Sequence, residues 1–206
     1  MAITYATWNP SDKGANIALS GGDLIASSSV AGYQSVRANI SKSTGKHAFE
    51  YTRSQLNNQA MLGFGDSGFS LSNHLGATAK SVGMQGGTGF QTNGITVIGY
   101  ADYNALIYMF ALDIDAGKGW ICSYGVWANS GNPAAGTNPS FTFTPGTILF
   151  PAITVTNNGS QTVTLNTGAS AFTNTVPSGF NAGWYTGTAD VSEGWPNLAG
   201  GWPDIT

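Results

Sequence analysis

Charged residues are scarce in this chain, and basic residues are the scarcest. Only 8% of the 206 residues are charged, with seven Lys or Arg against ten Asp or Glu and a net charge of −3. Coiled coils, helical bundles and intrinsically disordered chains need many more charged residues, so the composition excludes these classes. The seven basic residues are scattered and form no stripe that would neutralise a run of phosphates, which excludes nucleic acid as a partner.

Cysteine and long apolar runs are also nearly absent. Cys122 is the single cysteine, so no intrachain disulfide can form, and we interpret it as a small core residue. The longest apolar run, residues 105–112, is less than half of the ~20 residues that a membrane helix needs, so we expect no membrane span. The first ten residues have neither a basic region nor an apolar stretch, so we expect no signal peptide.

The chain also lacks the residue clusters that carry catalysis or bind metals. His47 and His74, the only histidines, have no zinc-site spacing; we expect His47 to be packed or half exposed and His74 to be solvated. Asp113 and Asp115 lie two apart and would share one face of a strand, but a metal site needs about six oxygen ligands and no further acidic cluster is near. Metal binding therefore stays the lesser alternative to a role as acceptors for turn amides. Glu50 is interpreted as a structural hydrogen-bond acceptor. We therefore expect no enzymatic activity, no bound metal and no cofactor.

Glycine and aromatic residues, in contrast, are abundant. The chain has 29 glycines, 12% aromatic residues and 41% hydrophobic residues. Apolar residues recur with a period of two between clusters of Gly, Asn, Ser and Pro, and glycine interrupts every stretch that has a helical period. The pattern predicts an all-β protein with an antiparallel two-sheet sandwich of ten to thirteen strands. The predicted strand segments are a hairpin over 16–27, then 36–40, 46–53, 61–65, 106–112, a return to 122, 141–143, 147–156 and 162–166.

Two neighbouring regions differ sharply in regularity. Residues 66–104 contain eight glycines between short apolar pieces, which predicts long surface loops with one or two short strands, the kind of region where binding commonly resides. Residues 106–112 are apolar at both odd and even positions, so both faces of a strand there would be apolar. This pattern predicts a central strand covered on both faces. The predicted core includes Phe49, Leu62, Phe110, Leu112, Ile153 and Leu165.

Trp127 is the main candidate for a binding residue. It lies in a predicted polar loop over residues 123–139, whose composition suits a platform for a sugar ring or a protein contact. Together with Tyr103, Asn129 and Asn132 it would form a stacking and amide site at the loop end. The equally weighted alternative is that Trp127 folds back over the open end of the sandwich and closes it.

Residues 185–206 have a different character from the predicted domain over residues 1–184. They contain no alternating run but repeat one motif seven residues apart, at Trp195-Pro196 and at Trp202-Pro203. Proline after tryptophan restricts the backbone to extended conformations, which predicts an extended arm. Each tryptophan can bury about 200 Å², worth roughly 5 kcal/mol before costs, so we expect both to dock.

The reach of the arm bears on where it docks. At the polyproline rise it would span about 70 Å, against a radius of about 17 Å for a domain of this size. We expect Trp195 and Trp202 to occupy apolar pockets on an adjacent subunit of a homo-oligomer. The alternative is that the arm folds back along its own sandwich.

Six short segments follow one another along the chain: 44–51 (TGKHAFEY), 61–65 (MLGFG), 112–117 (LDIDAG), 149–153 (LFPAI), 163–172 (VTLNTGASAF) and 176–180 (VPSGF). In this order they resemble segments of SPRY domains. Tyr124-Gly125 stands where the family usually has Asn-Gly, which predicts an altered turn. The resemblance extends over residues 8–184 and implies a bent antiparallel β-sandwich that binds partners through loops at one end.

The composition, rich in Asn, Thr and Gly, and the C-terminal sequence over residues 177–184 resemble those of SPRY-like domains in bacteriophage structural proteins. This resemblance implies a non-enzymatic virion protein, a capsid decoration or fibre component made in the host cytoplasm, with capsid or tail proteins as partners. Two alternatives remain. One is a carbohydrate-binding receptor module for a host-surface glycan, and the other is a cytosolic adaptor that binds a short peptide.

Overall fold

The computed structural model describes residues 2–56, 60–85, 106–156 and 161–187 in full, and the backbone of residues 89–92 and 95–98. Within those residues the regular elements are strands, apart from one short 3-10 turn, η1 (Ala128–Ser130). The prediction of an all-β chain is therefore confirmed.

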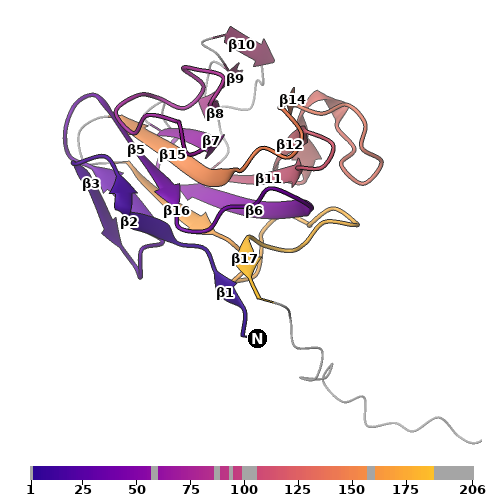
Figure 1. Ribbon diagram of the computed structural model, residues 1–206, viewed down its shortest axis with the longest axis horizontal. Coiled ribbons are helices and arrows are strands. Elements are labelled where there is room, and N and C mark those ends of the chain that lie inside the picture. The colour runs from indigo at the N-terminus through magenta and orange to yellow at the C-terminus, as the bar shows by residue number, and fades with distance from the viewer. Residues whose placement is uncertain are drawn as a thin grey trace, which may run out of the picture.

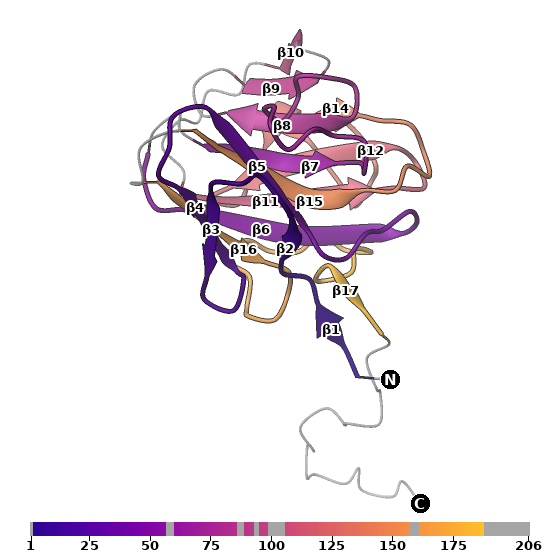
Figure 2. The same cartoon turned by 60° about the vertical axis from the view of Figure 1, so that its left-hand side comes forward.

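The strands form two large antiparallel sheets that pack face to face as the layers of a sandwich (Figures 1 and 2). The first sheet has the spatial order β10 (Ile95–Ile98), β9 (Gly89–Thr92), β8 (Ser81–Gln85), β7 (Ala60–Gly65), β15 (Phe150–Thr156), β5 (Tyr33–Ala38) and β2 (Trp8–Lys13). The second has the order β13 (Val126–Trp127), β12 (Lys118–Ser123), β11 (Ile107–Asp113), β6 (Lys46–Arg53), β16 (Thr162–Asn166), β4 (Ile25–Ser28) and β3 (Ile17–Ser20), and β14 (Phe141–Thr142) pairs with β12. A separate pair, β1 (Thr4–Tyr5) with β17 (Tyr185–Thr186), lies below the sandwich in both views.

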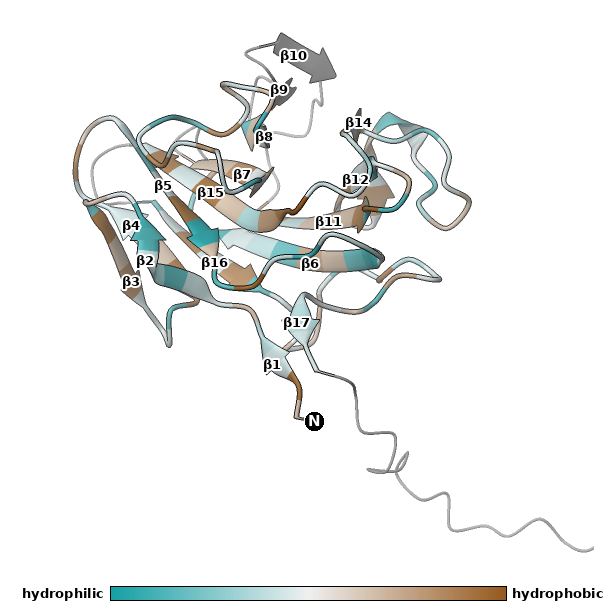
Figure 3. Ribbon diagram, viewed as in Figure 1, coloured by the Kyte–Doolittle hydropathy of each residue, from teal (hydrophilic) through white to brown (hydrophobic). Residues whose placement is uncertain are grey.

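Alternation along the strands decides which side chains enter the core. On β6, Phe49 and Tyr51 belong to the cluster between the sheets, whereas Ala48 belongs to a cluster on the outer face. Figure 3 shows this alternation as bands of apolar and polar residues along β5 and β6. The strands therefore form where the sequence pattern predicts them, because only that register buries the apolar set.

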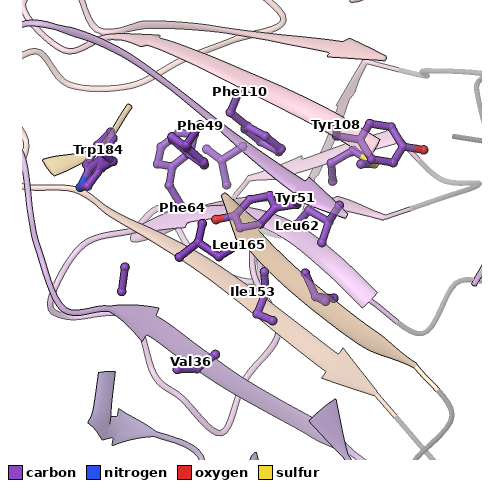
Figure 4. Packing of buried hydrophobic residues seen from close by; sticks show 14 of the residues in the cluster. Val36, Phe49, Tyr51, Leu62, Phe64, Tyr108, Phe110, Ile153, Leu165 and Trp184 are labelled. Atoms are coloured by element: carbon purple, nitrogen blue, oxygen red, sulfur yellow. The ribbon is translucent and has the colours of Figure 1, made fainter. Parts of the chain in front are cut away.

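The core itself contains every residue predicted for it, and none of the six is more than 1% exposed. Phe49 of β6 stacks on Phe110 of β11, with ring centroids 5.5 Å apart and planes at 7°. Figure 4 shows these rings together with Leu62 and Ile153, which come from the opposite sheet. Tyr51 adds a polar link within this apolar layer, because its hydroxyl donates to the Gly63 carbonyl of the first sheet at 2.7 Å.

The glycine-rich region differs from the prediction. Instead of loops with one or two strands, β8, β9 and β10 follow one another and extend the first sheet beyond β7. Gly63 and Gly83 pair across β7 and β8, and a Cβ on either would collide with Val82 or Leu75. These glycines therefore permit close packing on and within the sheet, and for Gly83 the sequence had been interpreted as part of a loop. The seventeen strands of the described residues exceed the ten to thirteen predicted.

The beginning of the arm also differs from the prediction, because Tyr185 and Thr186 form a strand. They pair with Tyr5 and Thr4, and the rings of Tyr5 and Tyr185 meet edge to face at 5.5 Å. Strands of two residues show no periodicity, so neither was predicted. The docking residues of the arm, Trp195, Pro196, Trp202 and Pro203, lie outside the described residues.

Candidate functional site

Residues 167–184, here called the strap, run across the outer face of the second sheet. The Ala48 amide donates to the Asn181 carbonyl at 3.0 Å, and the Asn181 amide donates to the Lys46 carbonyl at 2.9 Å. Strap residues Phe172, Val176 and Phe180 pack on outward-facing side chains of β6, β11 and β12, namely Ala48, Met109, Ala111, Trp120 and Cys122. This packing confirms that β11 is covered on both faces, as its apolar sequence predicts.

A buried carboxylate anchors the strap to the sheet. Glu50, 2% exposed, accepts hydrogen bonds from the Thr173 amide at 2.9 Å, the Asn174 amide at 2.7 Å and the Asn174 side-chain amide at 2.9 Å. Three donors on one carboxylate form a strong local lock. The structural role predicted for Glu50 is confirmed.

A groove of about 540 Å³ runs between the strap and the segment 127–134, and we call it the strap groove. The groove is lined on one side by Trp127, Asn132 and Pro133, and on the other by Val176 and Pro177. The two walls come from segments some 45 positions apart in sequence, each held on the same sheet. The strap groove is therefore a preformed surface feature of the tertiary fold.

A second hollow of about 300 Å³, the turn pocket, adjoins the groove. It is lined by Ile107, Tyr124, Gly125 and the strap residues 173–175. Thr175 lines both hollows, whereas Asn174 lines only the turn pocket and Val176 lines only the strap groove. Strap groove and turn pocket together form one surface, which we call the strap surface.

The turn at the end of this surface has an unusual residue in a restricted conformation. Tyr124 and Gly125 both have positive φ, 48° and 77°, between the paired residues Ser123 and Val126. Positive φ at both central positions defines the type I′ hairpin turn, which favours Asn-Gly. Tyr124 therefore replaces the usual asparagine, but the tight two-residue turn is kept. A bulky side chain is sterically unfavourable at positive φ, so tyrosine destabilises this turn relative to asparagine.

The turn presents apolar side chains to solvent. Tyr124 is 67% exposed and Val126 is 65% exposed. The Asn174 side-chain oxygen accepts from the Gly125 amide at 3.0 Å, so the strap holds the turn in place. Strain at an exposed and well-supported position is a sign of function, because folding alone would favour a smaller residue.

The loop that carries the groove wall is held by several hydrogen bonds to its own neighbours. Trp120 donates its indole N–H to the Thr137 carbonyl at 2.8 Å, and Lys118 donates to the Gly136 carbonyl at 2.9 Å. The Asn138 side chain donates to the Ser130 carbonyl at 3.2 Å. A loop fixed in this way offers its contacts without a large ordering cost.

The structure brings together only part of the predicted binding site. Trp127 is half-buried and packs on the outer face of the second sheet, so it both covers the sheet and lines the groove. Asn132 lines the groove, but its side-chain oxygen already accepts from the Ala135 amide at 3.1 Å. Asn129 is directed elsewhere, because its amide donates to the Pro139 carbonyl at 3.1 Å. Tyr103 lies outside the described residues.

The residues that sequence reasoning missed are Tyr124 and the strap residues Thr173 to Thr175. Tyr124 carried a signal, because it replaces the expected asparagine of a tight turn. The strap carried none: the three apolar residues that hold it are spaced four apart, and this spacing occurs in both strands and helices, so it predicts neither.

The candidate acid residues have structural roles. Asp113 is 6% exposed, pairs with Lys46 at 3.1 Å and accepts from the Ala116 amide at 3.0 Å. Asp115 accepts from the Gly45 amide at 3.0 Å. Both are therefore acceptors for turn amides, as predicted, and among the described residues no group of three or more potential metal ligands occurs.

The histidines and the cysteine lie inside the domain rather than in a hollow. His47 is 7% exposed and packs on Trp184 with ring centroids 5.3 Å apart, and burial lowers its pKa. His74, which we expected to be solvated, is half-buried against Tyr33 at 4.8 Å. Cys122 is buried, and burial raises its pKa to about 11.

In the part of the chain that the structure describes, no helix has the length and apolar character to cross a membrane.

Comparison with solved structures identifies the fold. The SPRY domain of human HERC1 matches with a TM-score of 0.63 and 13% identity, over 80% of this chain and 99% of that chain. The TRIM65 PSpry domain matches with a TM-score of 0.58 and 17% identity, over 79% and 92% of the two chains. Stonustoxin matches with a TM-score of 0.55 and 15% identity, over 79% of this chain and 27% of that chain. The chain therefore has the SPRY-type β-sandwich fold.

Sequence comparisons add no nearer relative. No family model matches the chain, and no curated protein gives a significant match. The likeness thus lies in the backbone arrangement and in the short segments quoted above.

Proposed function

We propose that this protein is a non-enzymatic recognition module that binds another protein through the strap surface. The observation that carries the proposal is the continuity of the surface from Tyr124 through Thr175 to Asn132, on two segments that are each fixed to one sheet. A preformed surface loses little entropy on binding, and exposed Tyr and Val side chains supply apolar area for a contact. The SPRY-type neighbours add support, because two of them are named as SPRY domains and the family resemblance implies recognition.

The proposal assigns no catalytic role to the carboxylates singled out in the sequence. Glu50, Asp113 and Asp115 each accept backbone hydrogen bonds, so a structural role accounts for all three. Hydrolysis of host polysaccharide by the purified protein would contradict this part of the proposal. Loss of the fold on treatment with a chelator would contradict the absence of an essential metal.

We place the module in a phage virion, as a capsid decoration or fibre component. The support is compositional: 8% charged residues and 29 glycines in a rigid β-sandwich, together with the resemblance to phage structural proteins. The partner is then a capsid or tail protein. The protein is expected to co-sediment with purified particles through a density gradient, and its recovery only in the particle-free fractions would contradict this placement.

Two exposed alanines allow a matched test of the surface. Ala134 lines the strap groove, and Ala18 lies on β3, away from it. We expect Ala134→Arg to weaken binding to particles that lack the protein by about tenfold or more, equivalent to about 1.4 kcal/mol, while Ala18→Arg binds normally. Equal binding by both variants would show that the partner does not use the strap groove.

A second candidate function is glycan binding, favoured by the half-buried Trp127 beside Asn132 in the groove. An indole face with a nearby amide suits a sugar ring. If the ligand is a host-surface glycan, a glycan array probed with the protein gives a signal that Ala134→Arg abolishes. A blank array leaves protein binding as the function of this surface.

The third reading, a cytosolic adaptor for a short peptide, uses the same surface. It differs in assembly, because an adaptor of this kind is expected to be a monomer that is absent from particles. Sedimentation of the purified protein, together with the particle fractionation above, separates it from the virion component.

A further inference from the structure

The strap groove is lined by uncharged residues. Its large apolar side chains are those of Trp127, Pro133, Val176 and Pro177, of which Pro133 is buried and the other three are half-buried. A charged side chain that entered the groove would lose water without gaining an opposite charge, so the groove fits an uncharged ligand. The other lining residues are small or carry a hydroxyl or amide group, namely Ser130, Gly131, Asn132, Ala134, Thr175 and Ser178.

The backbone of both walls is already occupied, which makes the groove unsuited to strand addition. In the first wall, the Asn132 amide donates to the Thr137 carbonyl and the Asn132 carbonyl accepts from the Thr137 amide, each at 3.1 Å. In the second wall, the Pro177 carbonyl accepts from the Phe180 amide at 3.1 Å. Pro133 and Pro177 have no N–H to offer. A ligand strand needs a row of free backbone donors and acceptors, so side chains have to hold the ligand instead.

Two side chains in the lining have N–H groups to offer. Within the described residues, neither the Trp127 indole N–H nor the Asn132 side-chain N–H donates to a protein group, while the Asn132 oxygen accepts from the Ala135 amide at 3.1 Å. Both can donate to a carbonyl oxygen of a ligand. A polyproline II segment has no internal hydrogen bonds, so its carbonyl oxygens are free to accept.

The apolar lining matches proline rings. Trp127 and two prolines present flat, rigid apolar groups, and aromatic-lined grooves of this kind bind proline-rich segments. Both walls are fixed before binding, because Trp127 packs on the second sheet and the strap is anchored by Glu50. A proline-rich ligand is also extended before binding, so neither side loses much entropy.

We propose that the strap groove binds an uncharged, proline-rich segment of the partner protein in the polyproline II conformation. The apolar lining packs on the proline rings, and Trp127 and Asn132 donate to the carbonyls of the segment. This inference rests on the proposed function, because it names the kind of segment that the strap surface recognises.

The test is an NMR titration of the complete chain with a capped peptide of ten L-prolines. The reporter is the indole N–H signal of Trp127, which is the signal missing from the spectrum of Trp127→Phe. A peptide of ten D-prolines is the matched control, because it has the same composition and forms the mirror-image helix. We expect the L-peptide to bind at least about tenfold more tightly than the D-peptide. Equal affinities, or no binding of either peptide, would overturn the inference.

A pair of variants tests where the peptide binds. Asn132→Asp removes the donor and adds a charge, but keeps the oxygen that accepts from the Ala135 amide. Asn16→Asp adds the same charge at an exposed position outside the groove. We expect Asn132→Asp to weaken binding of the L-peptide about tenfold and Asn16→Asp to leave it unchanged. Equal affinities of the two variants would overturn the inference.

The peptide titration needs no particles, so its outcome is separate from that of the proposed function. If the L-peptide fails to bind while Ala134→Arg still prevents particle binding, the strap surface binds another kind of protein segment and only this inference is overturned. If the L-peptide binds as expected while Ala134→Arg binds particles normally, the groove recognises polyproline and the particle contact lies elsewhere. A glycan-array signal without peptide binding would assign the groove to a sugar and overturn the inference.

Discussion

Asn174 connects the sheet to the turn of the strap surface through its two side-chain atoms. Its amide nitrogen donates to the buried carboxylate of Glu50 at 2.9 Å, and its oxygen accepts from the Gly125 amide at 3.0 Å. The carboxylate on the sheet, the strap and the Tyr124-Gly125 turn are therefore joined by one side chain. Asn174 is thus one support of the turn pocket, beside the β12–β13 pairing that closes the turn.

Replacing this asparagine should destabilise the fold and loosen the turn. Asn174→Ala removes one donor from the buried Glu50 carboxylate and the acceptor of the part-buried Gly125 amide bond, so we expect a loss of about 1–3 kcal/mol in the free energy of unfolding. Urea denaturation measures this change. Asn16→Ala, at an exposed position, is the control and should change stability by less than about 0.5 kcal/mol. Similar values for the two variants would show that the strap does not need this lock.

The conformation of Tyr124 predicts a gain in stability at the expense of binding. Asparagine tolerates the positive φ of the first turn position better than tyrosine does, so Tyr124→Asn should raise the free energy of unfolding by about 0.5 kcal/mol. The same change removes an aromatic ring that is 67% exposed and should weaken particle binding. Tyr33→Asn, at an exposed residue of β5 without positive φ, should show no gain. A loss of stability in Tyr124→Asn would mean that tyrosine is selected for the turn itself.

Much of the fold was predictable because its strands bury one face. Segments such as 46–53 and 162–166 keep strict alternation, and the structure places strands at those positions. The meander of β8 to β10 was missed because Gly83 serves close packing there, and glycine is the usual sign of a loop. A single sequence does not distinguish these two uses of glycine.

The candidate site was predictable in part for a different reason. Trp127 was expected to be either a platform or a cover, and the structure shows it packed on the outer face of the second sheet while it also lines the groove, so it covers the sheet and is available for a contact. The opposing wall, residues 175–178, comes from a segment whose position depends on Glu50 in another strand. Contacts between segments so far apart in sequence follow from the tertiary fold and leave no local pattern.

The buried His47 predicts a specific dependence of stability on pH. Burial lowers its pKa in the folded state below the ordinary value of 6.5, so the unfolded chain binds more protons between the two values. Stability from this residue is thus present above about pH 6.5 and declines as the pH falls toward the folded-state pKa. Free energies of unfolding measured from pH 7.5 to 5 should fall less steeply for His47→Gln than for the parent chain. Identical slopes for His47→Gln and the parent chain would contradict the assignment.

Tyr51 provides the clearest test of how the two sheets are held together. It is fully buried, its hydroxyl donates to the Gly63 carbonyl at 2.7 Å and lies 3.2 Å from the Ala152 carbonyl, and both acceptors belong to the opposite sheet. Burial raises the pKa of this hydroxyl well above its ordinary value, so it stays protonated as a donor. Tyr51→Phe keeps the ring but removes the hydroxyl that donates to the buried Gly63 carbonyl, and we expect a loss of about 1–3 kcal/mol in the free energy of unfolding by urea denaturation. Tyr33→Phe, the same change at an exposed ring, should cost less than about 0.5 kcal/mol. If Tyr51→Phe lowers the free energy of unfolding as little as Tyr33→Phe does, apolar packing alone holds the sheets together and the hydroxyl does not contribute.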